Sequence, residues 1–321
     1  MNPKQYPSPT VSVIIPAYNV APYIAETIQS VLTQSYTDYE IIVVNDGSTD
    51  KTEEAILEFR EHLIYVSQPN SGPSCARNNA IKLARGKYLA LLDGDDIWVP
   101  DYLEKMVGRL EAEPEIDLIF ANAELFGDPY FEGQYFFDKS PVSEPVTFEK
   151  VLTRECNVCI ASVFKRELIN RIGGFDPQLR GVEDFDLWLR MLKAGARFAY
   201  TLEPLLRYRK RSSSLSSEEI RLAQADIRVY EKVLEDPATT PLQQKLAQEM
   251  IEQREAKISL ATAKQLIANR DFQNATWYLQ KASSHYKGWK MKASVLALRT
   301  APSLFAWALN LREYVDKKLN S

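Results

Sequence analysis

Three aspartates crowd the end of one apolar segment. In YLALLDGDD, Asp93, Asp95 and Asp96 directly follow a run of apolar residues that is typical of a buried strand. Because like charges at this spacing repel, a compensating group is expected beside them. Helix capping by Asp96 or Asp101 would account for one aspartate. A divalent cation, Mg²⁺ or Mn²⁺, would also account for Asp93 and Asp95, since these ions combine carboxylates with substrate phosphates. We favour the cation.

Further polar residues follow the other strands expected in the first hundred residues. The apolar segments VSVIIPAYN, YEIIVVND, HLIYVSQ and KYLALLD alternate with helical patterns, which predicts a parallel sheet with right-handed crossovers. In such sheets ligands bind beyond the carboxyl ends of the strands. The residues at those ends are Pro16, Ala17, Tyr18 and Asn19, then Asn45, Asp46 and Gly47, then Gly72, Pro73 and Ser74, then the aspartates. The sequence therefore predicts a ligand site at this edge.

Phosphates that complete the coordination of a cation imply a nucleotide. A dinucleotide-binding Rossmann domain needs a glycine-rich turn after its first strand, and residues 11–35 contain no glycine. The phosphate-loop motif G-x-x-x-x-G-K-[ST] does not occur either, which excludes the P-loop NTPases. We expect a nucleotide that is held by neither of these cradles.

Length and composition fit a protein of ordinary globular type. The chain has 321 residues, enough for one large α/β domain with an appendage or for two domains. Acidic residues exceed basic ones before residue 218, which argues against nucleic-acid binding there, and the balance reverses afterwards. Cys75, Cys156 and Cys159 lack the spacing of a disulfide framework, which favours a reducing compartment. Without a signal-peptide core or a long apolar run, we expect a cytoplasmic protein.

The later part of the chain predicts a second, helical region. IDLIFANAELF, CNVCIASVFK and RFAYTLEPLLRYRKR are expected strands, and VEDFDLWLRMLKAG is an expected helix. From about residue 217 only helices are expected, which gives the domains 1–216 and 217–321. Residues 264–282 resemble one tetratricopeptide hairpin. For the apolar, lysine-flanked segment within 287–318 we weigh two interpretations: a helix packed on the first domain, or a peripheral helix on anionic membrane lipid.

Four ordered motifs resemble family 2 glycosyltransferases, the inverting group with the GT-A fold. They are VSVIIPAYN, VVNDGSTD, GPSCARNNAIKLARGKYLALLDGDD, and GGFD followed by GVEDFDLWLRMLKAG, and they span residues 10–215. The resemblance implies an α/β fold with a mostly parallel central sheet and flanking helices. It also implies transfer of a sugar from a nucleotide sugar, preferably a UDP-sugar, to the hydroxyl of a saccharide or lipid-linked acceptor, with Mn²⁺ or Mg²⁺ as cofactor.

The roles of family residues carry over onto the matching positions. The nucleotide-binding residues that the resemblance implies are Pro16, Ala17, Tyr18, Asn19, Asp46, Arg77, Asn78 and Asp93. Asp46 would hydrogen-bond the base, and Asp95 would bind the metal that bridges the diphosphate. Asp184, beside Glu183, would be the base that removes the acceptor proton, a contribution of about 10² to 10⁴ in rate. On position alone Asp184 fits a helix N-cap equally well.

One position departs from the family pattern. In YRKRSSSLS, Arg211 stands where a histidine that binds the metal is common, and neither His62 nor His285 can replace it by position. Arginine does not bind a cation, but its planar fork can hold a diphosphate. We therefore expect Arg209 or Arg211 to neutralise the leaving group, with weakened metal affinity.

Three further expectations remain open. Trp188 lies four residues after Asp184 and is expected either to stack on an acceptor sugar or to pack in the core. A non-catalytic nucleotide-sugar-binding or scaffold protein of the same fold is the second functional hypothesis; the missing histidine supports it, and the intact Asp46, Asp95 and Asp184 oppose it. A nucleotidyltransferase is disfavoured because the first strand is not followed by a glycine- and basic-rich loop.

Overall fold

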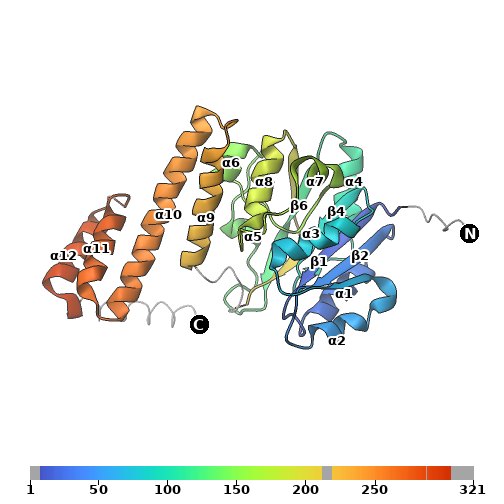
Figure 1. Cartoon of the computed structure of the whole chain (residues 1–321), viewed down its shortest axis with the longest axis horizontal. Helices are drawn as coiled ribbons and strands as arrows, with labels where there is room; N and C mark the ends of the chain where they lie inside the picture. Colours follow the sequence, from blue (N-terminus) through green and yellow to red (C-terminus); the bar gives the residue numbers. More distant parts are fainter. Residues whose placement is uncertain (1–7, 212–218, 287, 305–321) are drawn as a thin grey trace, which may run out of the picture. The chain divides into compact units, whose positions relative to one another are not determined.

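The chain folds into two compact units. A computed structural model describes residues 8–211, 219–286 and 288–304. The first unit is Met1–Arg211 and the second is Ser212–Ser321. The sequence predicts a boundary at residue 216. Figure 1 shows the strands confined to the first unit and α9 to α12 in the second.

The first unit is built on a mixed sheet with the strand order β3-β2-β1-β4-β7-β6-β8-β5. The strands are β1 (Val11–Ala17), β2 (Tyr39–Asn45), β3 (Ile64–Ser67), β4 (Tyr88–Leu91), β5 (Ile97–Trp98), β6 (Leu118–Phe126), β7 (Ser162–Lys165) and β8 (Phe198–Arg209). The first four are parallel, as the sequence predicts. Strand β7 runs antiparallel to both β4 and β6, and β5 runs antiparallel to β8. The second half of the sheet therefore departs from a parallel arrangement.

Helices surround this sheet. They are α1 (Ile24–Leu32), α2 (Thr52–Leu57), α3 (Pro73–Leu83), α4 (Tyr102–Ala112), α5 (Phe136–Lys139), α6 (Phe148–Leu152), α7 (Arg166–Ile172) and α8 (Glu183–Lys193), with a 3₁₀ turn at Arg60–His62. Helix α1 shows why they pack: Ile24, Ile28 and Val31 recur at helical spacing and are fully buried. Burial of this stripe fixes the helix on the sheet.

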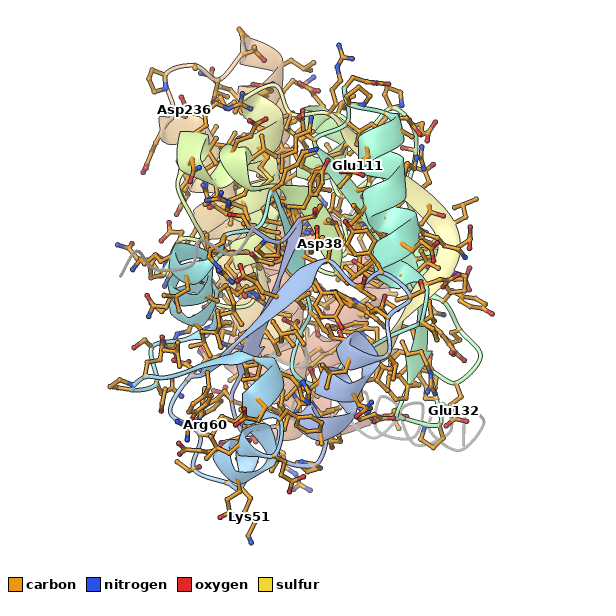
Figure 2. All side chains as sticks on the ribbon, turned by 90° about the vertical axis from the view of Figure 1, so that its right-hand side faces the viewer. Asp38, Lys51, Arg60, Glu111, Glu132 and Asp236 are labelled. Carbon is orange, nitrogen blue, oxygen red and sulfur yellow. The ribbon has the colours of Figure 1, made fainter. Side chains whose placement is uncertain are left out.

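The core lies along the central parallel strands. Strands β1, β2 and β4 are buried without alternation because both faces of a parallel sheet are covered. The buried carboxylate of Glu40 on β2 accepts a hydrogen bond from Ser12 Oγ on β1 at 2.7 Å, whereas Lys51 projects away from the ribbon near α2 (Figure 2). Packing of the central strands in this core therefore fixes the position of their carboxyl ends.

The first half of the expected strand CNVCIASVFK is a loop. Cys156 and Cys159 are buried in the loop between α6 and β7, which begins only at Ser162. Burial raises the pKa of the Cys159 thiol to about 12. A thiol that stays protonated is a poor metal ligand or nucleophile, so both cysteines serve as core residues.

The second unit is helical in the residues described. It contains α9 (Glu219–Glu235), α10 (Pro241–Ala268), α11 (Phe272–Ser283) and α12 (Trp289–Thr300). Helices α10, α11 and α12 share a small core of Ala263, Ile267, Ala275, Leu279 and Leu298. The α10–α11 pair forms the helical hairpin expected at 264–282. None of the described helices has the length and apolarity needed to cross a bilayer.

Candidate active site

Asp46 fixes the loop that follows β3. Its Oδ1 accepts hydrogen bonds from Gln68 Nε2 at 2.7 Å and from the Ser71 backbone N–H at 2.8 Å. Its Oδ2 accepts from the Gly72 backbone N–H at 2.8 Å. Three donors on one buried carboxylate hold the loop before α3 in place. In this structure Asp46 thus shapes the wall of the expected base pocket.

The end of β1 presents an aromatic ring beside this wall. Asn19 adopts a positive φ of 50°, and its Oδ1 accepts the Thr49 backbone N–H at 2.9 Å. Pro16 and Ala17 end the strand, and the Tyr18 side chain that follows is 46% exposed. An exposed ring on a fixed loop can stack on a nucleobase.

Arg77 joins the two acidic motifs. This residue of α3 is 4% exposed. Its Nη2 donates to Asp93 Oδ1 at 2.6 Å, and its Nη1 donates to Glu183 Oε1 at 2.7 Å. The Asp93 and Glu183 carboxylates raise the pKa of Arg77 above its usual range, against the effect of burial. The buried guanidinium of Arg77 therefore compensates the negative charge of Asp93, after β4, and that of Glu183, at the start of α8.

Asn78 positions the chain that leads to α8. Its Nδ2 donates to the Phe175 carbonyl and its Oδ1 accepts the Phe175 N–H, both at 2.8 Å. At Gly174 a Cβ atom would lie 2.2 Å from Asn78 Oδ1, so only glycine fits beside this amide. With both ends of its amide used by the backbone, Asn78 holds the loop rather than offering itself to a nucleotide.

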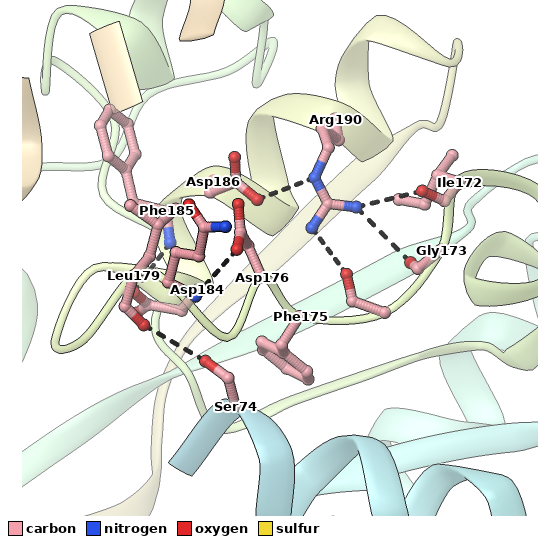
Figure 3. Close-up of polar contacts among 12 residues, drawn as sticks. Ser74, Ile172, Gly173, Phe175, Asp176, Leu179, Asp184, Phe185, Asp186 and Arg190 are labelled. Carbon is pink, nitrogen blue, oxygen red and sulfur yellow. Dashed lines mark hydrogen bonds and ion pairs between the residues drawn. The ribbon is translucent and has the colours of Figure 1, made fainter. Parts of the chain in front are cut away.

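The same loop is tied to α8 from the other side (Figure 3). Arg190 donates to Asp186 Oδ2 at 2.8 Å and to the Gly174 carbonyl at 2.8 Å. Ser74 Oγ, in the first turn of α3, donates to the Leu179 carbonyl at 3.3 Å. These contacts fix the first turn of α8 relative to α3.

The contacts that fix the first turn of α8 also position Asp184, the second residue of this helix. Its neighbour Glu183 is fully used, since Glu183 Oε2 also accepts the Gly181 N–H at 2.6 Å. Asp184 Oδ1 accepts the Phe185 N–H at 2.8 Å. Burial, then the charge of Glu183, raise the pKa of Asp184 to about 6, and Arg154 opposes them. A carboxylate with such a pKa can take a proton near neutral pH.

The aspartates after β4 are compensated by the end of β8. Asp96 is 1% exposed, and its Oδ1 accepts the Arg209 backbone N–H at 2.8 Å. Arg209 Nε donates to the Asp95 carbonyl at 2.8 Å, and its Nη2 donates to Glu26 at 2.7 Å. Arg211 Nη2 lies 2.7 Å from Asp95 Oδ2. Burial raises the pKa of Asp95 to about 6, although Arg211 lowers it.

The capping interpretation of these aspartates is wrong. Asp96 binds the β8 backbone, and Asp101, although it precedes α4, makes no side-chain cap and pairs with Lys105 at 2.8 Å. Within residues 8–211, 219–286 and 288–304 no group of three or more His, Cys, Asp or Glu residues could hold a metal ion. The expected cation would depend on one or two carboxylates together with substrate phosphates, so the contacts of Asp95 and Asp93 decide whether it fits.

The donor set therefore does not fit a metal as it stands. Asp95 is the residue that would bind it, and its carboxylate already neutralises the Arg211 guanidinium. Asp93 is likewise engaged by Arg77. A divalent cation at Asp95 would have to displace one positive charge and would face a second from Arg209.

Trp188 lies in the core of the first unit. Its side chain is 1% exposed and packs edge-to-face against Phe164 and Phe198, with ring centroids 6.1 and 6.2 Å apart. A ring enclosed in this way is a core residue, so its assignment to an acceptor sugar is wrong.

Two arginines that the sequence did not single out lie near the site. Arg180 lies against Gly72, where a Cβ atom would be 3.3 Å from its Nε. Arg154 stacks its guanidinium over the Phe185 ring at 3.5 Å and has a positive φ of 64°. In the sequence, the position of Arg180 just before the Glu183–Asp184 pair could have singled it out. No sequence pattern singles out Arg154.

The chain is similar to known glycosyltransferases. The family model described as Glycosyl transferase family 2 matches residues 12–172. The putative teichuronic acid biosynthesis glycosyltransferase TuaG of Bacillus subtilis is 33% identical over 230 residues, which cover 70% of this chain and 88% of that protein. The UDP-Glc:alpha-D-GlcNAc-diphosphoundecaprenol beta-1,3-glucosyltransferase WfgD of Escherichia coli is 31% identical over 231 residues, which cover 71% and 87%.

A solved structure extends the agreement to the fold. The mannosyltransferase PcManGT of Pyrobaculum calidifontis, in complex with GDP-Man and Mn²⁺, has a TM-score of 0.59 at 23% identity and covers 98% of this chain and 89% of its own. The mixed sheet with flanking helices is the GT-A fold that the motifs predict, and the chain is a glycosyltransferase of family 2.

Proposed function

We propose that this enzyme is an inverting transferase that moves a sugar from a nucleotide sugar to an acceptor hydroxyl, with Asp184 as the base. The observation that carries the proposal is the Arg77 bridge, which holds Asp93 and Glu183 at 2.6 and 2.7 Å. Because the bridge engages Glu183, the adjacent Asp184 is left to face the reaction. The site therefore supports a structural role for Glu183 and a catalytic role for Asp184.

The reaction follows from this arrangement. The acceptor oxygen attacks the anomeric carbon while the bond from that carbon to the diphosphate oxygen breaks, and the bonding electrons leave with the diphosphate. Asp184 takes the acceptor proton. A single displacement of this kind inverts the anomeric centre. The pKa of Asp184, raised to about 6, suits a base that must be ionised at pH 7 yet still accept a proton.

The donor is proposed to lie along the edge formed by the ends of β1, β2 and β4. Tyr18 would stack on the base, Asp46 and its loop would line the pocket, and Asp93 would lie near the ribose. A UDP-sugar is the preferred donor, in view of the name of the Escherichia coli relative, and that name also suggests a lipid-linked saccharide as acceptor. The sequence predicts metal assistance at Asp95 by Mn²⁺ or Mg²⁺, but no step is assigned to a metal because Asp95 is already paired with Arg211.

Nucleotide release tests the proposal. The protein is incubated with UDP-glucose, UDP-N-acetylglucosamine or GDP-mannose and a diphosphate-linked N-acetylglucosamine lipid, and free nucleotide is measured. We expect release with one donor, dependent on acceptor, and its loss in Asp184→Asn. Binding of donors without any turnover would instead identify a non-catalytic nucleotide-sugar-binding protein.

We also propose that α12 contacts the surface of an anionic membrane, where a lipid-linked acceptor would be found. Trp289, Lys292, Leu296 and Arg299 recur at helical spacing, and Trp289 and Leu296 are 74% and 63% exposed. Exposed apolar side chains can enter the headgroup region of a membrane, and neighbouring lysine and arginine side chains are attracted to anionic lipid. Residues 305–318 of the predicted segment lie outside the described residues.

Vesicle sedimentation tests this contact. The wild type should sediment with phosphatidylglycerol vesicles, and Trp289→Ser with Leu296→Ser should remain in the supernatant. Leu242→Ser, at an exposed leucine on α10, is the matched control and should behave as the wild type. Sedimentation of the double variant to the wild-type extent would reject the contact.

A further inference from the structure

Arg211 occupies the place where a cation is expected. Its Nη2 lies 2.7 Å from Asp95 Oδ2, and its side chain is 23% exposed against 14% for Asp95. An ion pair between groups that are largely withdrawn from water is far less screened than a surface pair. The carboxylate that would attract a metal is thus already neutralised by the protein itself.

The end of β8 holds Arg211 in this position. Two residues earlier, Arg209 is anchored by its backbone N–H on Asp96 and by its Nε on the Asp95 carbonyl. The guanidinium groups of Arg209 and Arg211 both lie over the Tyr23 ring, at 4.6 and 5.4 Å from its centroid. The pair therefore forms a fixed double positive charge beside the aspartates, since residues two apart on an extended chain share a face.

Arg211 also has an unused donor. Its Nε is buried and has no hydrogen-bond partner among the described residues. A buried donor without a partner is costly, so such an atom points to a missing ligand. Guanidinium N–H groups match the geometry of phosphate oxygens, and one edge can bind phosphate while another holds a carboxylate.

We propose that Arg211 replaces the divalent cation of this site and holds the diphosphate of the donor without a metal. The inference rests on the proposed function, because it takes a nucleoside diphosphate as the ligand. Arg211 holds the phosphate oxygens while its Nη2 stays on Asp95, and Arg209 supplies the second positive charge. The negative charge that builds on the leaving diphosphate is then stabilised by two fixed guanidinium groups.

Calorimetric titration with UDP and with GDP tests the inference. For the nucleotide that binds, the wild type should show dissociation constants in EDTA and in Mn²⁺ that agree within about threefold. Arg211→Ala should bind at least tenfold more weakly in EDTA. Arg211→His restores a metal ligand, so its affinity should rise at least tenfold on adding Mn²⁺, and it should reduce the electron paramagnetic resonance signal of free Mn²⁺.

Arg207→Ala provides the matched control. Arg207 lies on the same strand and pairs with Glu124 at 3.3 Å on a partly exposed surface, so its loss should leave nucleotide affinity unchanged. Thermal unfolding of each variant verifies that it is folded. Nucleotide binding by the wild type that weakens tenfold or more in EDTA, or Arg211→Ala binding as the wild type does in EDTA, overturns the role of Arg211 alone. Failure of both nucleotides to bind in either buffer overturns the proposed function with it.

Discussion

Removal of the Arg77 guanidinium should destabilise the first unit strongly. Arg77→Met keeps much of the buried volume but leaves Glu183, whose side chain is 7% exposed, and Asp93, at 28%, without their shared partner. Breaking a buried ion pair by removing one partner costs about 3–5 kcal/mol, because an uncompensated charge stays buried. In a unit of this size each kcal/mol lowers Tm by roughly 2–4 °C, so a fall of roughly 6–20 °C is expected.

Thermal unfolding followed by circular dichroism measures this effect. Lys105→Met is the control, since Lys105 pairs with Asp101 and Glu203 on an exposed surface and should leave Tm unchanged. The activity of Arg77→Met should also fall at temperatures below its melting point, because both acidic motifs lose their shared partner. A Tm of Arg77→Met within 2 °C of that of Lys105→Met would mean that the loss in the free energy of unfolding is less than roughly 1 kcal/mol. That result would show that the Arg77 bridge does not hold the site together.

Three other outcomes follow from the site and the fold. Because the pKa of Asp184 is raised to about 6, its active, ionised form is lost as pH falls through that value. The value of kcat/KM should therefore drop about tenfold per pH unit below 6. A rate independent of pH between 5 and 7 would contradict the role of Asp184 as base. Gly174→Ala places a Cβ atom 2.2 Å from Asn78 Oδ1 and should cost about 1–3 kcal/mol in the free energy of unfolding, with reduced activity; unchanged denaturant midpoints would refute the close contact. Gly108→Ala, in α4, meets nothing within 4 Å and should instead stabilise the protein by about 0.5–1 kcal/mol, as the midpoint of the same titration will reveal.

The parallel half of the sheet could be predicted because its sequence carries strong local signals. Unbroken apolar runs such as residues 41–44 are typical of strands that are covered on both faces, and the polar residues after them mark the ligand edge. The antiparallel placement of β7 and β5 could not be predicted in the same way. Strand β5 has two residues, too few to show any period, yet its pairing with β8 brings Arg209 and Arg211 to the aspartates.

The site residues show the same limit. The type and position of Asp184 could be predicted, but its relation to Arg77 could not, since the Arg77–Glu183 contact spans 106 residues. Trp188 illustrates the converse error. Helical spacing places it on the face of Asp184, but spacing alone does not tell that this part of the face turns into the core, where Trp188 meets Phe164.

The role of Asp184 as the base can be measured directly by the rate of sugar transfer from a saturating donor in Asp184→Asn. Asparagine keeps the shape of the side chain but cannot accept the proton. We expect the transfer rate to fall by about 10² to 10⁴, with unchanged affinity for the donor nucleotide. A variant that transfers sugar within tenfold of the wild-type rate would contradict it.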